Sequence, residues 1–353
     1  MKKPITIHDF TLIIPSKNRP LYIERIVNYY ADSGLTILVC DSSEEPYRKV
    51  MPSTNIKYLH FKNYVFASKM KAALTYVTTN FVAMCAVDDF IVPQALKEGV
   101  KFLNENRNYS SVQGNYITFK NINGNVVFTP NLQYYDREIA SDLPNDRLIE
   151  LFSNYFGLYY AIHRTENFEV IFNIAIEAEI RNLNFVEIII AVVSLISGKH
   201  KVLPLFYSAK ESIDGSAGST DTVTNFVKDS GYSEQYTTFI NKCSEYLFEN
   251  GLFDKQSAER VIRKAMQTYI EWGDSRIIYE YEKEAASSRS DIIKDIPVAG
   301  KLLLKLYSKQ IGTKKLQQSL VKLVDGKKGF PFNEASGRTE LKKIEHFVKC
   351  FKV

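Results

Sequence analysis

The sequence predicts an α/β protein in which helices wrap a mainly parallel sheet. Strand and helix patterns alternate over the first hundred residues, and three apolar runs in this part each stop on polar side chains. Continuous apolar runs are typical of parallel strands that are buried on both faces. A chain of 353 residues, 45% hydrophobic and 24% charged, is long enough for one large domain or two modest ones.

The first half alternates between short apolar runs and segments with helical spacing. A helix is expected from Pro20 to Tyr30, where a proline at the start is favourable and apolar residues recur on one side. Met70, Ala73, Leu74 and Val77 share one face of a second helix. The strands are expected at residues 10–15, 37–40, 56–61 and 81–88, and the helices at 20–30, 67–77 and 93–98.

Residues 111–135 change character. Apolar and polar residues alternate on both sides of a Gly/Asn-rich turn, which predicts a hairpin. Farther on, a very apolar helical segment is stopped by Gly198. The elements expected here are the hairpin strands 111–119 and 126–128, a helix at 146–156, a strand at 159–163, a helix at 185–196 and an extended segment at 201–207.

The apolar run at 81–88 ends on two adjacent carboxylates, Asp88 and Asp89. Ligands of open α/β sheets collect outside the carboxyl ends of such strands. Two acids held there can bind a divalent cation and, through it, a diphosphate. The alternative is that one of them caps the helix that begins at Pro93, because Asp is a favoured N-cap residue.

Polar residues also follow the first two strands, at 15–20 and 41–43. Each segment has a local explanation as a turn or a helix start. If the strands are neighbours, however, all three tips open onto one cleft, and this agreement favours the metal interpretation of the acid pair. Such a cleft suits a nucleotide, because Asp41 can accept hydrogen bonds from a base or a ribose and Lys69 can neutralise a diphosphate.

Three segments resemble family 2 glycosyltransferases of the GT-A fold. TLIIPSKNRP at 11–20 resembles their opening strand and loop, LVCDSS at 38–43 resembles their second strand, and 79–93 resembles the segment that carries their DxD motif. The similarity covers residues 8–211 and is strongest over the first 100. It implies a Rossmann-like mixed sheet flanked by helices.

The resemblance also implies roles for individual residues. Asp41 matches the carboxylate that contacts the nucleotide base, and Asp89 matches the ligand of Mg²⁺ or Mn²⁺. The chain departs from the motif at Val87, where the first acid is often found. Either Asp88 substitutes for this acid or the chain uses a looser metal site, and the first alternative is favoured. The expected nucleotide-sugar site comprises Pro15, Ser16, Asn18, Arg19, Asp41, Ser42, Lys69, Asp88 and Lys210.

Inverting transfer needs a carboxylate that takes the proton of the acceptor hydroxyl as its oxygen attacks the anomeric carbon. In the family this acid opens a helix, and Glu187 is the match, although Ile188 replaces the second acid of the motif. A carboxylate beside a very apolar helix is expected to have a raised pKa. A favourable interaction with the helix dipole is the simpler interpretation, and Glu177 and Glu179 are alternatives for the base.

Lys210 follows the last strand, where family members often carry a basic residue or a histidine near the diphosphate. His163 and His200 are further candidates, although a lone histidine is more often structural. The aromatic residues at 155, 156, 159 and 160 suit a stacking platform for an acceptor sugar, but their density favours a core position.

A small, polar segment at 213–220 predicts a linker between a GT-A domain, 1–215, and a mainly helical C-terminal domain, 216–353. Residues 292–353 carry 14 Lys and Arg against 5 Asp and Glu, whereas the remainder carries 31 against 35. Within 297–309 three lysines share one helical stripe. A bundle helix with a solvated lysine face is slightly favoured over a helix on an anionic membrane surface.

Several classes of protein are disfavoured. No apolar run approaches the ~20 residues of a membrane span, and polar residues interrupt any signal-like start, so we expect a cytoplasmic protein that is at most peripheral on the inner face of the membrane. The four cysteines lack metal-ligand spacing and predict free thiols. No GxGxxG follows the first strand and no nucleic-acid motif occurs, so neither a dinucleotide nor a nucleic acid is expected.

These patterns, with the resemblance, predict a metal-dependent, inverting glycosyltransferase. The resemblance alone implies a setting in bacterial surface polysaccharide or glycoconjugate assembly. Such an enzyme would move a sugar from a nucleotide-diphosphate donor to a saccharide or lipid-linked acceptor. One alternative is a sugar-phosphate nucleotidyltransferase, whose Gly-rich phosphate loop is missing from residues 15–20. The other is a non-catalytic sugar-nucleotide-binding or scaffolding subunit, which Val87 and Ile188 make credible.

Overall fold

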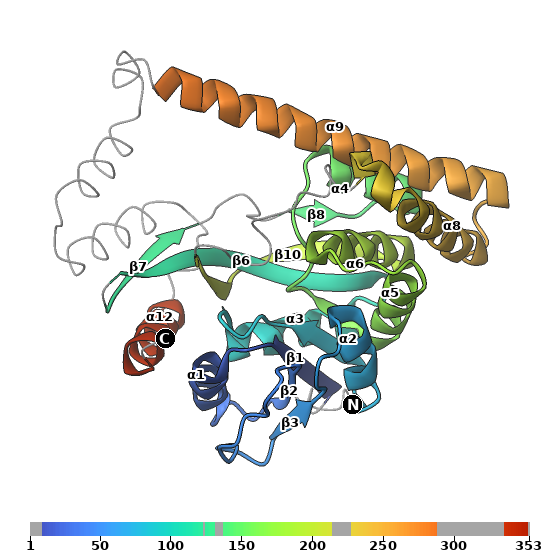
Figure 1. Cartoon of the computed structure of the whole chain (residues 1–353). Coiled ribbons are helices and arrows are strands. Elements are labelled where there is room, and N and C mark those ends of the chain that lie inside the picture. The colour runs from blue at the N-terminus through green and yellow to red at the C-terminus, as the bar shows by residue number, and fades with distance from the viewer. Residues whose placement is uncertain (1–8, 123, 131–136, 214–226, 288–334, 352–353) are drawn as a thin grey trace.

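The computed structural model describes residues 9–122, 124–130, 137–213, 227–287 and 335–351. One large mixed sheet forms its centre and helices cover both faces (Figure 1). The strand order is β3-β2-β1-β4-β9-β6-β10-β5, with β7 paired to β6 and β8 paired to β10. The expected α/β class is therefore confirmed.

The first half of the sheet is parallel, as predicted. Its strands are β1 (Phe10–Ser16), β2 (Thr36–Asp41), β3 (Ile56–His60) and β4 (Phe81–Met84). β1 lies between β2 and β4, and the register pairs Ser16 with Asp41 at the carboxyl ends of β1 and β2. The polar segments that follow these strands consequently lie at one edge of the sheet.

The second half of the sheet mixes directions. The strands are β5 (Phe90–Ile91), β6 (Tyr109–Ile122), β7 (Asn125–Pro130), β8 (Glu138–Ile139), β9 (Ile162–Arg164) and β10 (Lys199–Glu211). β6 and β7 form the expected antiparallel hairpin, whereas β6 and β10 are parallel. β9 is antiparallel to both β4 and β6.

Successive residues of the central strands belong alternately to two separate hydrophobic cores. On β1, Leu12 and Ile14 belong to one core and Ile13 belongs to the other, because successive side chains of a strand point to opposite faces. The first core lies under α1 (Pro20–Tyr30) and α3 (Pro93–Glu105). The second lies under α2 (Phe66–Leu74), α4 (Pro144–Ser153), α5 (Thr165–Glu177) and α6 (Leu183–Ser197).

The expected strand at 81–88 differs from the observed one. β4 ends at Met84, and Asp88 and Asp89 lie in the loop between β4 and β5. Val92 occupies the N-cap position of α3, and no side chain caps this helix. The cap interpretation of the acid pair is therefore wrong. Pro93 at the first helical position, whose missing N–H needs no cap partner, fits this start.

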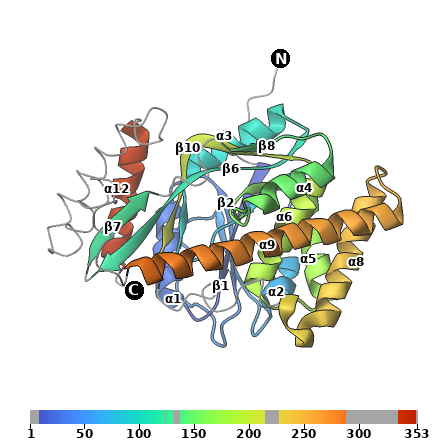
Figure 2. The ribbon, with the colours of Figure 1, turned by 90° about the horizontal axis from the view of Figure 1, so that it is seen from above.

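The C-terminal helices return to the sheet domain. α8 (Ser233–Glu249) and α9 (Lys255–Ser287) share one hydrophobic core with α4, α5 and α6, and α9 crosses over α4 (Figures 1 and 2). α12 (Ala335–Cys350) lies beside α1 and β7, where Ile344 and Val348 are fully buried. A single turn, η2 (Ser230–Tyr232), precedes α8.

Parts of the expected C-terminal organisation lie outside the described residues. They include the linker beyond Ile213, the boundary at 215 and the lysine-striped segment 297–309. Among the described residues, no helix is long and apolar enough to cross a membrane. The four cysteines are free thiols, as expected.

Candidate functional site

The ends of β1 and β2 are joined by a short hydrogen-bonded chain. Asn18 adopts a left-handed backbone with φ 56°, a conformation that asparagine tolerates better than most residues. Its N–H donates to Ser43 Oγ at 2.7 Å, and Ser43 Oγ donates to Asp41 Oδ1 at 2.7 Å. The two predicted segments, 15–20 and 41–43, are thus neighbours in space.

Asp41 is buried and accepts hydrogen bonds on both oxygens. Besides the Ser43 hydroxyl, Oδ1 accepts from the Ser43 N–H at 3.3 Å, and Oδ2 accepts from the Tyr58 hydroxyl at 2.9 Å. The Tyr58 hydroxyl in turn accepts from the Tyr47 N–H at 2.8 Å. A pocket of about 350 Å³ lies here, lined by Asn18, Pro20, Ile23, Asp41, Ser43, Glu44, Glu45, Pro46 and Tyr47.

Lys69 lies beneath these strand ends and does not face the pocket. Its ammonium donates to the Ser16 carbonyl at 2.7 Å and to Ser42 Oγ at 3.0 Å, and the residue is 3% exposed. Burial lowers the pKa of Lys69 to about 8. In this structure Lys69 supports the loop that carries Ser16 and Ser42, and its contact with a diphosphate stays a prediction.

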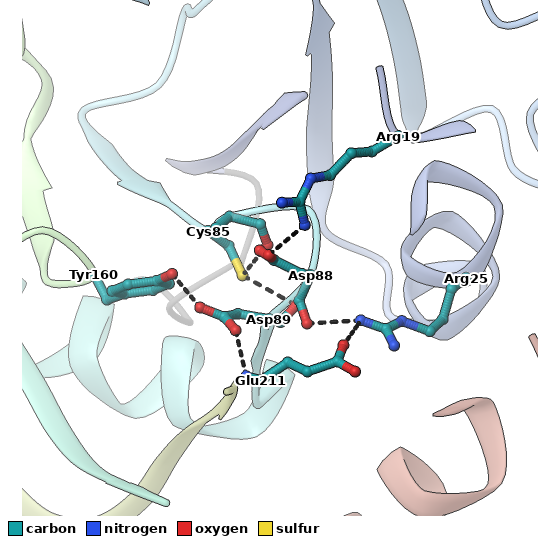
Figure 3. Close-up of polar contacts among 8 residues, drawn as sticks. Arg19, Arg25, Cys85, Asp88, Asp89, Tyr160 and Glu211 are labelled. Atoms are coloured by element: carbon teal, nitrogen blue, oxygen red, sulfur yellow. Dashed lines mark hydrogen bonds and ion pairs between the residues drawn. The ribbon is translucent and has the colours of Figure 1, made fainter. Parts of the chain in front are cut away.

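The acid pair lies in a network of charged groups (Figure 3). Asp88 pairs with Arg19, whose Nη1 lies 2.7 Å from Oδ2. Asp89 is buried and accepts from the Tyr160 hydroxyl and, at 2.6 Å, from the Glu211 N–H. Burial, with the neighbouring Asp88 charge, raises the pKa of Asp89 to about 7.

Two residues of this network carry no signal of function in the sequence. Arg25 on α1 is buried and donates from Nη2 to the Asp88 carbonyl and to Glu211 Oε2, both at 2.7 Å. Nothing in the sequence marks a position inside an amphipathic helix as part of a site. Glu211 ends β10 next to the predicted Lys210, and only the pairing of β10 with β5 brings it to the acid pair.

Lys210 connects the acid pair with the predicted base. Its ammonium lies over the rings of Tyr116 and Tyr160, 4.3 Å from each centroid. Its charge partly offsets the rise in the pKa of Asp89, and it does the same for Glu187. Lys210 therefore lies within electrostatic reach of both carboxylates.

Glu187 lies in the second turn of α6 and not at the helix start, where Asn182 is the cap and accepts from the Phe185 N–H. Its half-buried carboxylate lies against Gly157, and a Cβ at that glycine would overlap Oε1. Burial raises the pKa of Glu187, while Lys210 and the Tyr155 hydroxyl lower it. The helix-dipole interpretation of Glu187 is not supported, because the residue lies beyond the first turn and an N-terminal dipole would lower, not raise, the pKa of a carboxylate.

The alternative candidates lie elsewhere. Glu177 and Glu179 are exposed around the end of α5, where Glu177 pairs with Lys242 at 2.9 Å. His163 and His200 are fully buried, and burial lowers their pKa values to about 4 and about 3.

The aromatic group has mixed roles. Phe156 is a core residue, whereas Tyr160 is half-buried and donates to Asp89. Burial raises the pKa of the half-buried Tyr159, and Glu187 and both acids of the pair add to the rise. Its hydroxyl is therefore within electrostatic reach of Glu187 and of the acid pair.

The acid pair provides carboxylate ligands for a cation but not a complete set of protein ligands. In the described ranges, no group of three or more His, Cys, Asp or Glu side chains is arranged to hold a metal ion. Carboxylate oxygens are nevertheless the donors that hard divalent cations prefer, and Mg²⁺ is commonly bound by one or two carboxylates together with substrate phosphates. Asp88 and Asp89 therefore suit a cation that is bound jointly by protein carboxylates and substrate phosphates.

Comparisons with known proteins support the resemblance. Residues 11–164 match the family model of glycosyl transferase family 2. The crystal structure of S. aureus TarS 1–349 in complex with UDP-GlcNAc is similar at 15% identity; the match covers 75% of this chain and 73% of that chain, with a TM-score of 0.50. The UDP complex of TarS 1–349 matches at 13% identity over 98% of this chain and 90% of that chain, with a TM-score of 0.47. None of the curated protein sequences compared with the chain matches it.

The family match covers β1 to β9, and therefore the strand ends, the acid pair and Tyr160. The similarity to TarS shows a shared fold and extends beyond the family segment. Residues 11–164 thus match glycosyl transferase family 2, the fold is that of GT-A enzymes, and the chain is a glycosyltransferase.

Proposed function

We propose that this enzyme transfers a sugar, with inversion, from a nucleotide-diphosphate donor to a saccharide or lipid-linked acceptor. The observation that carries the proposal is the position of Lys210. Its ammonium lies 4.3 Å from the ring of Tyr160, which donates to Asp89, and its charge lowers the pKa of both Asp89 and Glu187. An acid that faces the donor diphosphate and an acid that faces the acceptor are the two groups this reaction needs.

The nucleotide is assigned to the pocket at the ends of β1 and β2. Asp41 has its oxygens ordered by Ser43 and Tyr58 before any ligand arrives, which lowers the entropic cost of recognising a base N–H. Asn18 and Pro20 line the same pocket, while Arg19 faces the acid pair. UDP is the first nucleotide to test, because the TarS structures are complexes with UDP-GlcNAc and UDP.

The diphosphate is assigned to the space beside Asp88, Asp89, Arg19 and Lys210. Asp89 would hold Mg²⁺ or Mn²⁺ jointly with the diphosphate, and the bound cation would supply positive charge to the leaving group. Arg19 and Lys210 add two positive charges near the same place. A shared cation needs only one or two protein carboxylates.

Glu187 is assigned as the general base. The acceptor oxygen bonds to the anomeric carbon, its proton passes to a Glu187 oxygen, and the bond from the anomeric carbon to the diphosphate oxygen breaks. The nucleoside diphosphate then leaves with the bonding electrons. A carboxylate with a raised pKa is better matched to this proton transfer than a fully exposed one.

A cytoplasmic location with peripheral membrane contact is part of the same proposal. It rests on the family resemblance and on the 14 basic residues of 292–353, most of which lie outside the described ranges. A lipid-linked acceptor would bring the enzyme to such a surface. Co-sedimentation of the protein with anionic and with neutral vesicles tests this location. If equal amounts of protein sediment with both, electrostatic contact with the membrane is contradicted.

Nucleotide binding is the first experiment. Thermal unfolding should be measured with UDP, GDP, CDP and ADP, each with Mn²⁺ and with EDTA. We expect one nucleotide to raise the unfolding temperature, and to raise it more with Mn²⁺, because ligands that bind only the folded state stabilise it. No shift with any of the four would overturn the proposal.

Replacing the base is the second experiment. Glu187→Gln should lower transfer about 10²–10⁴-fold and leave nucleotide binding unchanged, since the amide keeps the shape but cannot take a proton. Glu177→Gln is the matched control, because Glu177 is exposed and paired with Lys242 away from the site. Normal transfer by the Glu187 variant would remove this residue from the mechanism.

A further inference from the structure

Arg25 is buried more completely than its hydrogen bonds explain. Its exposed fraction is 0%, yet only Nη2 donates, to the Asp88 carbonyl and to Glu211 Oε2. Within the described part of the chain, the buried Nε and Nη1 groups have no hydrogen-bond partner. Rings of Tyr22 and Phe90 lie 4.6 and 5.1 Å from its guanidinium and recover part of the cost through cation–π attraction.

A second buried arginine shows what a purely structural solution looks like. Arg147 donates to the carbonyls of Leu195 and Ile196 and, from Nη1, to those of Ser141 and Asp142. All three of its side-chain nitrogens therefore have partners. Because burying a guanidinium with unmade hydrogen bonds is costly, stability alone does not account for Arg25.

The two bonds of Arg25 connect three segments of the site (Figure 3). The guanidinium comes from α1, the Asp88 carbonyl from the β4–β5 loop, and Glu211 from the end of β10. The Glu211 N–H also donates to Asp89 Oδ1 at 2.6 Å. Arg25 consequently fixes the acid pair and the end of β10 relative to each other.

The end of β10 also carries Lys210. Successive residues of a strand point to opposite faces, so Glu211 turns to Arg25 while Lys210 turns to the rings of Tyr116 and Tyr160. Anchoring Glu211 on one face therefore sets the position of Lys210 on the other. A displacement of about 1 Å in such a group is enough to lower a rate substantially.

We propose that Arg25 and Glu211 are positioning residues of this glycosyltransferase: they hold Asp88 and Asp89 at the distance from Lys210 that binding of a metal-bound diphosphate requires. The inference rests on the proposed function and adds two residues to it. Neither side chain is assigned a contact with the donor. Their effect passes through the Asp88 carbonyl, the Glu211 N–H and the end of β10.

The test compares Arg25→Met, Arg25→Lys and Glu211→Gln with the wild type. Arg147→Met is the matched control, because it also removes a buried arginine. The affinity for UDP is measured by calorimetry with Mn²⁺ and with EDTA, and thermal unfolding is followed in parallel. If the wild type is stabilised by GDP, CDP or ADP instead, that nucleotide replaces UDP as the probe.

We expect Arg25→Met to weaken nucleotide binding at least fivefold with Mn²⁺ and less than twofold in EDTA, because the pocket around Asp41 does not depend on the contacts of Arg25 with Asp88 and Glu211. Arg25→Lys should recover part of the loss, since an ammonium reaches one of the two partners. Glu211→Gln keeps an acceptor for Arg25, so its nucleotide affinity with Mn²⁺ should fall less than that of Arg25→Met. Arg147→Met should lower the unfolding temperature without changing the ratio of the two affinities.

Two outcomes would overturn the inference. One is an unchanged ratio of the two affinities in folded Arg25→Met and Glu211→Gln, and the other is the same change of ratio in Arg147→Met. If Arg25→Met does not fold, Arg25→Lys and Glu211→Gln decide the question. A wild type that binds none of the four nucleotides would instead contradict the proposed function itself.

Discussion

Asp41 and Asp89 are two buried aspartates at the same edge of the sheet, held in opposite ways. Within the described residues, the donors to Asp41 are all neutral: the Ser43 N–H and hydroxyl and the Tyr58 hydroxyl. Asp89 lies next to a second carboxylate, and burial and the Asp88 charge raise its pKa to about 7. Hydrogen bonds hold the Asp41 carboxylate in place, whereas burial and a neighbouring carboxylate disfavour the ionised form of Asp89. In the proposed function, nucleotide recognition and chemistry would therefore use the same residue type in different environments.

The largest expected difference is in transfer. Asp89→Asn should lower kcat about 10²–10³-fold, because it removes the carboxylate assigned to the cation and diphosphate. Asp41→Asn should act mainly on the donor KM, by roughly tenfold, because one hydrogen bond to the base is worth about 1–2 kcal/mol. Steady-state kinetics with the donor varied measure both effects. Equal losses of kcat in the two variants would remove the distinction between the sites.

The same two substitutions should change stability in opposite directions. At pH 8 in EDTA, Asp89→Asn should raise the free energy of unfolding by about 1–3 kcal/mol. Removing a charge whose pKa rises from 3.8 to about 7 is worth about 4 kcal/mol, and this outweighs the about 1–2 kcal/mol lost where the amide NH₂ replaces an oxygen that accepts from Tyr160 or from the Glu211 N–H. Asp41→Asn should lower it by about 1–3 kcal/mol, because an amide NH₂ would replace one of the two oxygens that accept from Ser43 and Tyr58. Urea unfolding of both variants measures the signs.

The gain from Asp89→Asn should depend on pH. The pKa of Asp89 rises from an ordinary value of 3.8 to about 7 on folding, so the folded state holds this proton more tightly than the unfolded state. The stabilising contribution of the proton is present below about pH 4 and is lost as the pH rises through 7. The variant should therefore match the wild type at pH 4 and exceed it at pH 8. A constant difference between pH 4 and pH 8 would contradict this origin.

The sequence predicted the region around Asp41 better than the region around Asp89. Local patterns sufficed for the first: a parallel pair of apolar strands brings 15–20 and 41–43 together, and β1, α1, β2 and β3 lie within two residues of their predicted bounds. The resemblance to family 2 is confirmed by the family match over residues 11–164. The buried position of Lys69 was missed, because no local pattern shows which way a helical lysine turns.

The region around Asp89 depends on contacts between distant segments. Glu211 lies 122 positions beyond Asp89, and Arg25 lies 186 positions before Glu211. No local periodicity encodes such pairings, and the sequence treats Arg25 as one more residue of an amphipathic helix. The run at 81–88 was read as one strand because Cys85, Ala86 and Val87 are as apolar as the residues of β4. In the structure β4 ends at Met84, and Phe90 and Ile91 form a separate strand that is antiparallel to β10.

The smallest expected effects come from the two tyrosines that donate to these aspartates. Tyr58→Phe and Tyr160→Phe each remove one hydrogen bond and should each lower the free energy of unfolding by about 0.5–1.5 kcal/mol. Only Tyr160→Phe should also shift the pH profile of the transfer rate, moving its acidic limb to higher pH. The Tyr160 hydroxyl lowers the pKa of Asp89, so its loss lets that pKa rise further and a higher pH is needed to ionise the carboxylate. The Tyr58 variant is the control, since its donor belongs to Asp41; a shift of the same size in both variants would mean that the acidic limb does not report on Asp89.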